Sequence, residues 1–116
     1  MSIRRINPGP RMSQAAVHGG LVFLAGQVAD DASADVAGQT RQILAKIDAV
    51  LAEAGSDKSR ILSTTIWLSD IGTFGEMNSV WDAWVDKQNP PARATVEARL
   101  AAPAFKVEIA AVAAAG

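Results

Sequence analysis

The 116-residue sequence lacks cysteine altogether and contains one histidine, His18. Without thiols the chain has no disulfide, no thiolate nucleophile and no cysteine-based zinc site. A histidine beside Gly19 and Gly20 is typical of an exposed turn, and a single histidine does not build a metal site. We therefore expect no metal and assign His18 no functional role.

Acidic and basic residues are nearly balanced, and the apolar segments are short. Eleven basic residues stand against twelve acidic ones, for a net charge of −1, and the sequence has no lysine or arginine cluster. Because such clusters attract phosphate backbones, nucleic acid is not an expected partner. No segment approaches the roughly 20 apolar residues that span a bilayer, and the N-terminus has no apolar core of signal-peptide length. We expect a cytoplasmic protein without a membrane partner, folded as one domain over residues 1–116.

Several short runs have the pattern of strands. Residues 14–17 and 21–28 are apolar and are separated by a connection with two glycines, which predicts a hairpin. Residues 61–68 are rich in β-branched side chains, as in a buried strand. Two further strands are predicted at residues 92–98 and 107–113, joined through a turn near Pro103.

Two segments have helical periodicity. Apolar residues recur at helical spacing between positions 36 and 54, with Asp35 in the first turn and Gly55 as the stop. A second helix is predicted from Thr73, whose spacing to Glu76 is that of a capping box, and it ends before Pro90-Pro91. The apolar stripe of this helix is interpreted as core packing and not as a binding platform; it comprises Phe74, Met77, Trp81, Trp84 and Val85.

The order of these elements predicts an α+β fold. The predicted order is strand, strand, helix, strand, helix, strand, strand. This order suits one mixed sheet with both helices on the same face, because right-handed crossovers place them there. The last strand is apolar on both sides, and no helix of the chain is left to cover the second face. We therefore expect a homo-oligomer with a pocket where subunits meet.

The sequence Pro-Pro-Ala-Arg-Ala-Thr-Val-Glu at positions 90–97 places a fixed cation on a strand. The two prolines end the preceding helix, and the alternation that follows puts Arg93, Thr95 and Glu97 on one face. A guanidinium is a planar fork that matches a carboxylate bidentately. The pattern predicts a carboxylate-binding site, although an ion pair of Arg93 with Glu97 or Glu108 suits the same residues.

Five short motifs follow one another in a specific order: Ser13-Gln14-Ala15, Gly26-Gln27, Met77-Asn78, Pro91-Ala92-Arg93 and Lys106-Val107-Glu108-Ile109. In this order, over nearly the whole chain, they resemble the RidA family, also called the YjgF family. The resemblance implies a chorismate-mutase-like fold and a homotrimer whose sheets form a central β-barrel, with three sites at subunit interfaces. It also implies hydrolysis of 2-imino acids, or their enamine tautomers, to 2-oxo acids and ammonia without a cofactor.

The resemblance carries roles to individual residues. Arg93 matches the arginine that binds the substrate carboxylate, and Glu108 matches the carboxylate on the last strand that orients water. Thr95 falls where many members have cysteine, and Asn78 matches an asparagine of the second helix near the site. Since that cysteine is not an obligatory nucleophile, a threonine is compatible with activity.

Two positions depart from the family pattern and make the expected pocket less polar. Met12 stands where the family often has a pocket tyrosine, and Ala25 stands where it often has a serine before Gly-Gln. Both are counted among the substrate-binding positions. These departures indicate a divergent subgroup of the family.

The chemistry implied by the resemblance suits the residues. A protonated imine is already electrophilic, so Arg93 can fix the substrate while Glu108 directs water at it. The alternative is a non-catalytic module that binds or senses a small carboxylate metabolite, which Met12 and Ala25 slightly favour. A nuclease or translation inhibitor is disfavoured by the charge and by the lack of a catalytic histidine and acid cluster.

Overall fold

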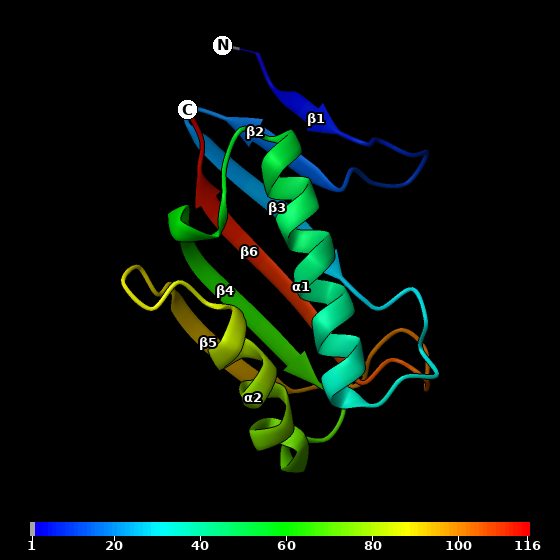
Figure 1. Cartoon of the computed structure of the whole chain (residues 1–116). Coiled ribbons are helices and arrows are strands. Elements are labelled where there is room, and N and C mark those ends of the chain that lie inside the picture. The colour runs from blue at the N-terminus through cyan, green and yellow to red at the C-terminus, as the bar shows by residue number, and fades with distance from the viewer. Residues whose placement is uncertain (1) are drawn as a thin grey trace.

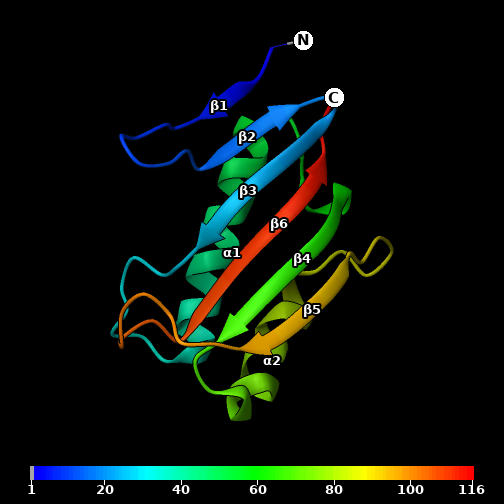
Figure 2. The same cartoon turned by 180° about the vertical axis from the view of Figure 1, so that it is seen from behind.

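The computed structural model describes residues 2–116 and consists of one six-stranded sheet with two helices on one face (Figures 1 and 2). The expected α+β fold is therefore confirmed. The strands lie in the order β1-β2-β3-β6-β4-β5, and only the β4–β5 pair is parallel. The elements are β1 (Arg4–Ile6), β2 (Ala15–His18), β3 (Leu21–Gln27), α1 (Val36–Glu53), β4 (Ile61–Leu68), α2 (Phe74–Trp84), β5 (Ala92–Glu97) and β6 (Val107–Ala114), with short 3₁₀ turns η1 (Lys58–Arg60) and η2 (Ile71–Thr73).

The predicted strands agree with the structure to within one residue at each end. The hairpin turns at Gly19 and Gly20, whose φ values of 60° and 78° lie in the left-handed region that glycine adopts without strain. Strand β1 was not predicted. It has three residues, of which only Ile6 is buried, and so it is too short to show the alternation that identifies a strand.

Helix α1 begins and ends as the sequence predicts. The Asp35 carboxylate accepts a hydrogen bond of 2.8 Å from the Gly38 backbone N–H, and the chain leaves the helix through Gly55 with φ 78°. In the first turn of this helix lies Gln39, which is fully buried. Its amide donates to three carbonyl oxygens and accepts from the backbone N–H of Lys106, at 2.9 Å. Helix α1 therefore holds the start of β6.

The capping box predicted at the start of α2 is wrong. Thr73 makes no side-chain cap; its hydroxyl donates to the Asp70 carbonyl at 2.6 Å. The cause is η2, which runs directly into α2 and keeps Thr73 out of the extended conformation that a capping residue adopts. The Glu76 carboxylate accepts instead from the Ala37 backbone N–H at 3.0 Å, in the first turn of α1. Glu76 thus joins the starts of the two helices.

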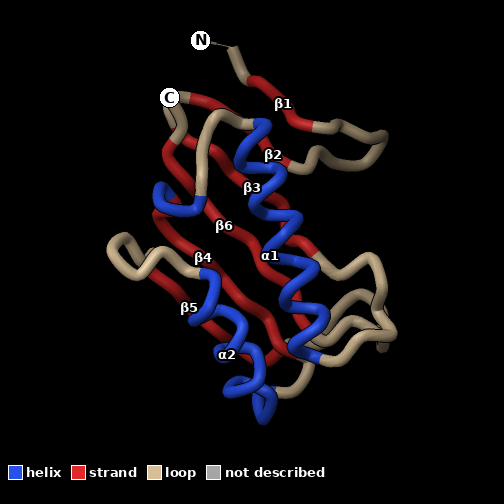
Figure 3. The backbone as a smooth tube through the Cα atoms, viewed as in Figure 1, coloured by secondary structure: helices blue, strands red, loops and turns tan. Residues whose placement is uncertain are grey.

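Both helices lie on one side of the sheet (Figure 3), and the two faces of the sheet differ in burial. On the side of α1 and α2, alternate residues of β6 are buried, whereas the residues between them are only half-buried. No element within residues 2–116 covers the other side, hereafter the open face (Figure 2). Phe23 and Val96 lie there, 47% and 45% exposed. Neither helix of the described chain has the length and apolar character needed to cross a bilayer.

Candidate functional site

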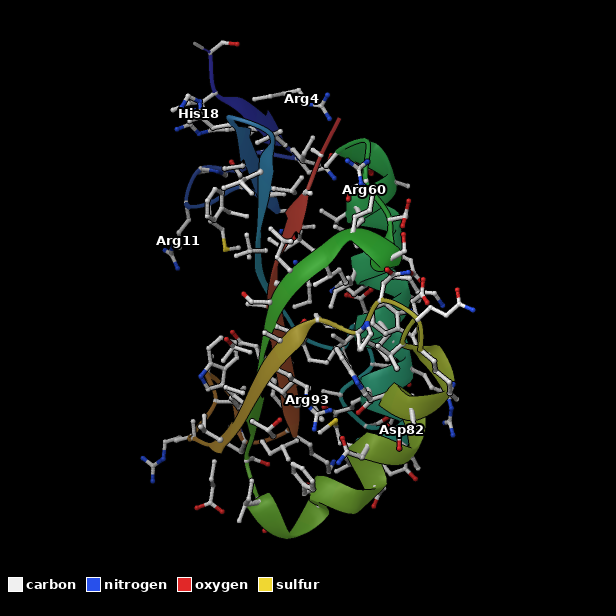
Figure 4. The ribbon with its side chains drawn as sticks, turned by 90° about the vertical axis from the view of Figure 1, so that its left-hand side faces the viewer. Arg4, Arg11, His18, Arg60, Asp82 and Arg93 are labelled. Carbon is white, nitrogen blue, oxygen red and sulfur yellow. The ribbon has the colours of Figure 1, made fainter. Side chains whose placement is uncertain are left out.

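Arg93 lies on the edge strand β5 and points toward the helix layer. The parallel register pairs Thr95 with Ile66, which is fully buried beneath the helices, so Thr95 and its alternate neighbours Arg93 and Glu97 face the same way. Figure 4 shows the Arg93 side chain between β5 and α2, far along the sheet from His18. The predicted common face of these three residues is confirmed.

Three residues of α2 hold the Arg93 guanidinium. Its Nη1 donates to Asn78 Oδ1 at 2.7 Å, and its Cζ lies 5.6 Å from the Phe74 ring centroid and 5.2 Å from that of Trp81. The three residues are four and three positions apart and form one stripe of the helix. The interpretation of Phe74 and Trp81 as core packing alone is incomplete, because Phe74 is 40% exposed and both rings contact the cation.

Arg93 forms no ion pair within residues 2–116. The carboxylate of Glu97, one of its two expected structural partners, accepts from the Ile71 backbone N–H at 3.0 Å. The other, Glu108, lies on the opposite face of the sheet. A half-buried guanidinium with one amide partner and no carboxylate keeps donors free for an anion.

Glu108 lies on the open face. It pairs with Trp67 of β4, the residue after Ile66, which is buried beneath the helices. Because successive side chains of a strand point to opposite faces, Trp67 and its partner Glu108 point away from the helices. Its carboxylate packs over Gly26, where a Cβ atom would collide with Oε2. The register shift of β3 between Leu24 and Gln27 places Gly26 beneath it. Glu108 thus depends on the missing side chain at Gly26.

A shallow hollow adjoins Glu108. It has a volume of about 220 Å³ and is lined by Trp67, Arg99 and Glu108 together with three small or apolar residues of the β5–β6 loop. The loop turns where predicted, with a hydrogen bond of 3.1 Å from the Phe105 N–H to the Ala102 carbonyl. The open-face carboxylate therefore borders a space that a small molecule can enter.

The remaining predicted positions lie apart from Arg93 in the chain. Ala25 precedes Gly26 at the irregularity of β3, and its N–H donates to the Gln14 carbonyl at 2.9 Å. Met12, 49% exposed, lies in the loop between β1 and β2. One chain therefore brings together Arg93, Asn78 and Thr95 on the helix side, whereas Glu108 is placed beside the Ala25–Gly26 segment.

Two buried hydroxyls near Arg93 have no hydrogen-bond partner within the described residues, those of Thr95 and Thr64. Thr64 is the residue of β4 that pairs with Arg93. The sequence analysis missed Thr64, although a polar residue on the buried face of a predicted strand is a usable signal, since buried polar groups normally find a partner.

Three carboxylates in exposed turns have lowered pKa values. Hydrogen bonds from the Ser33 side chain and backbone lower the pKa of Asp31, and those from Ser59 lower the pKa of Asp57 in the same way. The backbone N–H of Gln88 is the main cause of the lowered pKa of Asp86. Within residues 2–116, no group of three His, Cys, Asp or Glu side chains is arranged to hold a metal ion.

The model of the protein family described as Endoribonuclease L-PSP matches residues 2–115. The chain belongs to this family, the YjgF/RidA family. A RutC family protein of Haemophilus ducreyi is 48% identical over 107 residues, which are 92% of each chain. The RutC family protein YoaB of Escherichia coli is 46% identical over 114 residues, which are 98% of this chain and 99% of YoaB.

A solved structure extends the likeness to the fold. The crystal structure of a YjgF family member from Neisseria meningitidis matches with a TM-score of 0.97 and 48% identity, over 100% of this chain and 97% of that one. The family resemblance seen in the sequence motifs is therefore confirmed, together with the fold that it implies.

Proposed function

We propose that this member of the YjgF/RidA family hydrolyses reactive 2-imino acids, or their enamine tautomers, to 2-oxo acids and ammonia. The observation that carries the proposal is Arg93, whose guanidinium is fixed by α2 and has no carboxylate partner among residues 2–116. A substrate carboxylate supplies that partner with bidentate geometry. The substrate class is thus a small carboxylate with a reactive carbon next to the carboxyl group.

The reaction is a balanced hydrolysis. Arg93 binds the carboxylate and fixes C2 of the protonated imine, and water adds to C2 to give a tetrahedral carbinolamine. Glu108 takes a proton from the water and returns it to the nitrogen. The nitrogen then leaves as ammonia while the Glu108 carboxylate accepts the remaining hydroxyl proton, which passes to solvent, and C2 becomes the carbonyl of the 2-oxo acid. Acid–base help of this kind contributes about 10²–10⁴-fold, which is adequate for a reaction that also proceeds without an enzyme.

The opposite orientations of Arg93 and Glu108 support a site made by two subunits. Because the two side chains lie on different faces of one sheet, a single chain offers a carboxylate-binding half and a water-directing half. The apolar residues of the open face, Phe23 and Val96, are suited to contact with further copies. We take the assembly to be the cytoplasmic homotrimer that the family resemblance implies.

The test is release of ammonia and 2-oxo acid from imines generated in place by an amino-acid oxidase. Wild type is expected to accelerate the release, and Arg93→Ala to lose the acceleration while remaining folded and oligomeric. Co-assembly of Arg93→Ala with Glu108→Gln then tests the shared site. If each site takes one residue from each of two neighbours, random mixing restores about a quarter of the sites. Activity in Arg93→Ala equal to wild type would contradict the proposal.

A second function is favoured by the apolar positions near the site. Met12 is exposed and Ala25 adds no polar group beside Gly26, so the pocket is suited to hold a carboxylate metabolite without turnover. Binding of 2-oxobutanoate that depends on Arg93, combined with no acceleration for any imine, selects this reading over the deaminase.

A further inference from the structure

Phe74 occupies an unusual position for a large apolar side chain. It is the first residue of α2, it is 40% exposed, and it does not belong to the hydrophobic core cluster beneath the helices. Packing in the hydrophobic core therefore does not explain the aromatic side chain at this position. Its contact with the Arg93 guanidinium does, since the guanidinium Cζ lies 5.6 Å from the ring centroid.

The contacts of Arg93 leave a defined set of donors free. Asn78 Oδ1 takes one hydrogen of Nη1, and the rings of Phe74 and Trp81 lie against the cation. Nη2 and Nε have no hydrogen-bond partner within residues 2–116. Those two groups form one side of the guanidinium fork, and their spacing matches the two oxygens of a carboxylate.

We propose that Phe74 is a positioning residue for Arg93. Its ring, together with Trp81, holds the guanidinium in the pose that presents Nη2 and Nε to a ligand carboxylate. An arginine side chain has many rotamers, and a cation–π contact on an exposed aromatic restricts them before the ligand arrives. This inference rests on the carboxylate-binding role of Arg93 in the proposed function and adds Phe74 to the site as a determinant of affinity.

The proposal predicts a specific kinetic pattern. Since the carboxylate is bound in the ground state and in the transition state alike, loss of the clamp weakens binding and leaves kcat unchanged. The strength of cation–π contacts corresponds to a loss of about 2- to 30-fold in affinity. The variant Phe74→Leu, whose side chain is apolar but has no aromatic face, is expected to show this loss, whereas Phe74→Tyr retains wild-type affinity.

The experiment compares Phe74→Leu, Phe74→Tyr and the control Ile71→Ala, which trims a 43% exposed side chain of η2, outside the α2 stripe that holds Arg93. The first readout is ¹⁵N relaxation of the Arg93 Nε–Hε group in the unliganded protein, which reports picosecond-to-nanosecond motion. The second is the Kd of 2-oxobutanoate, with kcat and KM for the imine.

The expected result is a mobile Arg93 and a raised Kd and KM in Phe74→Leu only. Equal rigidity of Arg93 in Phe74→Leu and wild type overturns the proposal, as does an unchanged Kd. The same loss in Ile71→Ala also overturns it, because the effect then reflects a general disturbance of the start of α2. The Arg93→Ala variant distinguishes failure of the proposed function from failure of this inference. Wild-type binding and turnover in that variant refute the proposed function, whereas the relaxation data independently test whether Phe74 fixes the pose of Arg93.

Discussion

At the scale of single residues, the side chain that is absent at Gly26 matters as much as any that is present. A Cβ atom at this position would collide with Oε2 of Glu108 and lie 3.0 Å from its Cδ and 3.2 Å from its Cγ. A methyl group there excludes the observed rotamer of Glu108. The tight contacts are all with a flexible side chain and not with backbone, so the sheet itself can persist.

Gly26→Ala is therefore expected to lower kcat without unfolding the protein. If Glu108 directs the water, its displacement costs about 10²–10⁴-fold in kcat. The measurement is steady-state imine hydrolysis together with the thermal midpoint. Gly75→Ala is the matched control, because a Cβ at Gly75 meets no atom within 4 Å. Unchanged kcat in Gly26→Ala would show that the position of Glu108 is irrelevant to the reaction.

At the level of helices and strands, local sequence patterns were sufficient to predict the segments whose structure depends mainly on their own residues. The hairpin, the strand at residues 61–68 and helix α1 depend on alternation, periodicity and glycine turns, and all were predicted. The capping box failed because η2 changed the backbone at Thr73 and because Glu76 found a partner on another helix. A tertiary contact of this kind leaves no signal in a short window of sequence.

The candidate site was likewise predictable only where a local pattern places a residue. Alternation after Pro91 placed Arg93 and Thr95 on one face, but the orientation of Glu108 follows from the pairing of β6 with β4. That pairing depends on a sheet order in which the last strand lies between β3 and β4, and no local pattern specifies it. The contact of Phe74 with Arg93 depends on the angle at which α2 crosses β5, and was missed for the same reason.

The clearest inter-element connection is Gln39, which predicts a large effect on stability. Gln39→Leu preserves the approximate volume but leaves the carbonyls of Ala32 and Ala104 and the N–H of Lys106 without their partner, whereas the Ala34 carbonyl keeps its bond from Lys106 Nζ. Since each unsatisfied buried group costs about 1–3 kcal/mol, the free energy of unfolding is expected to fall by about 3 kcal/mol or more.

Urea unfolding at neutral pH measures the change. The neighbouring Gln42→Leu serves as the control, because the bonds of Gln42 to Asp31 are exposed and their loss is expected to cost less than about 1 kcal/mol. Equal losses in the two variants would contradict the bridging role of Gln39.

At the scale of the whole molecule, the open face should decide both the assembly and the activity. Phe23→Glu and Val96→Glu each place a charge on that face, at 47% and 45% exposed positions. Burial of an unpaired carboxylate between subunits is costly, so dissociation of the proposed trimer is expected, with loss of turnover although Arg93 and Glu108 are intact.

Light scattering coupled to size-exclusion chromatography measures the mass, and imine hydrolysis the activity. Ile71→Glu is the control, since Ile71 is 43% exposed but lies in η2 on the helix side. A trimer that persists in both open-face variants would place the subunit interface elsewhere.

The opposite orientations of Arg93 and Glu108 have one more consequence. If every working pair comes from two chains, a folded protomer in isolation carries both residues and completes no site. Specific activity then falls on dilution below the dissociation constant of the assembly and returns on concentration, without any protomer unfolding. Under the proposed function, turnover per chain would then report the concentration of the protein.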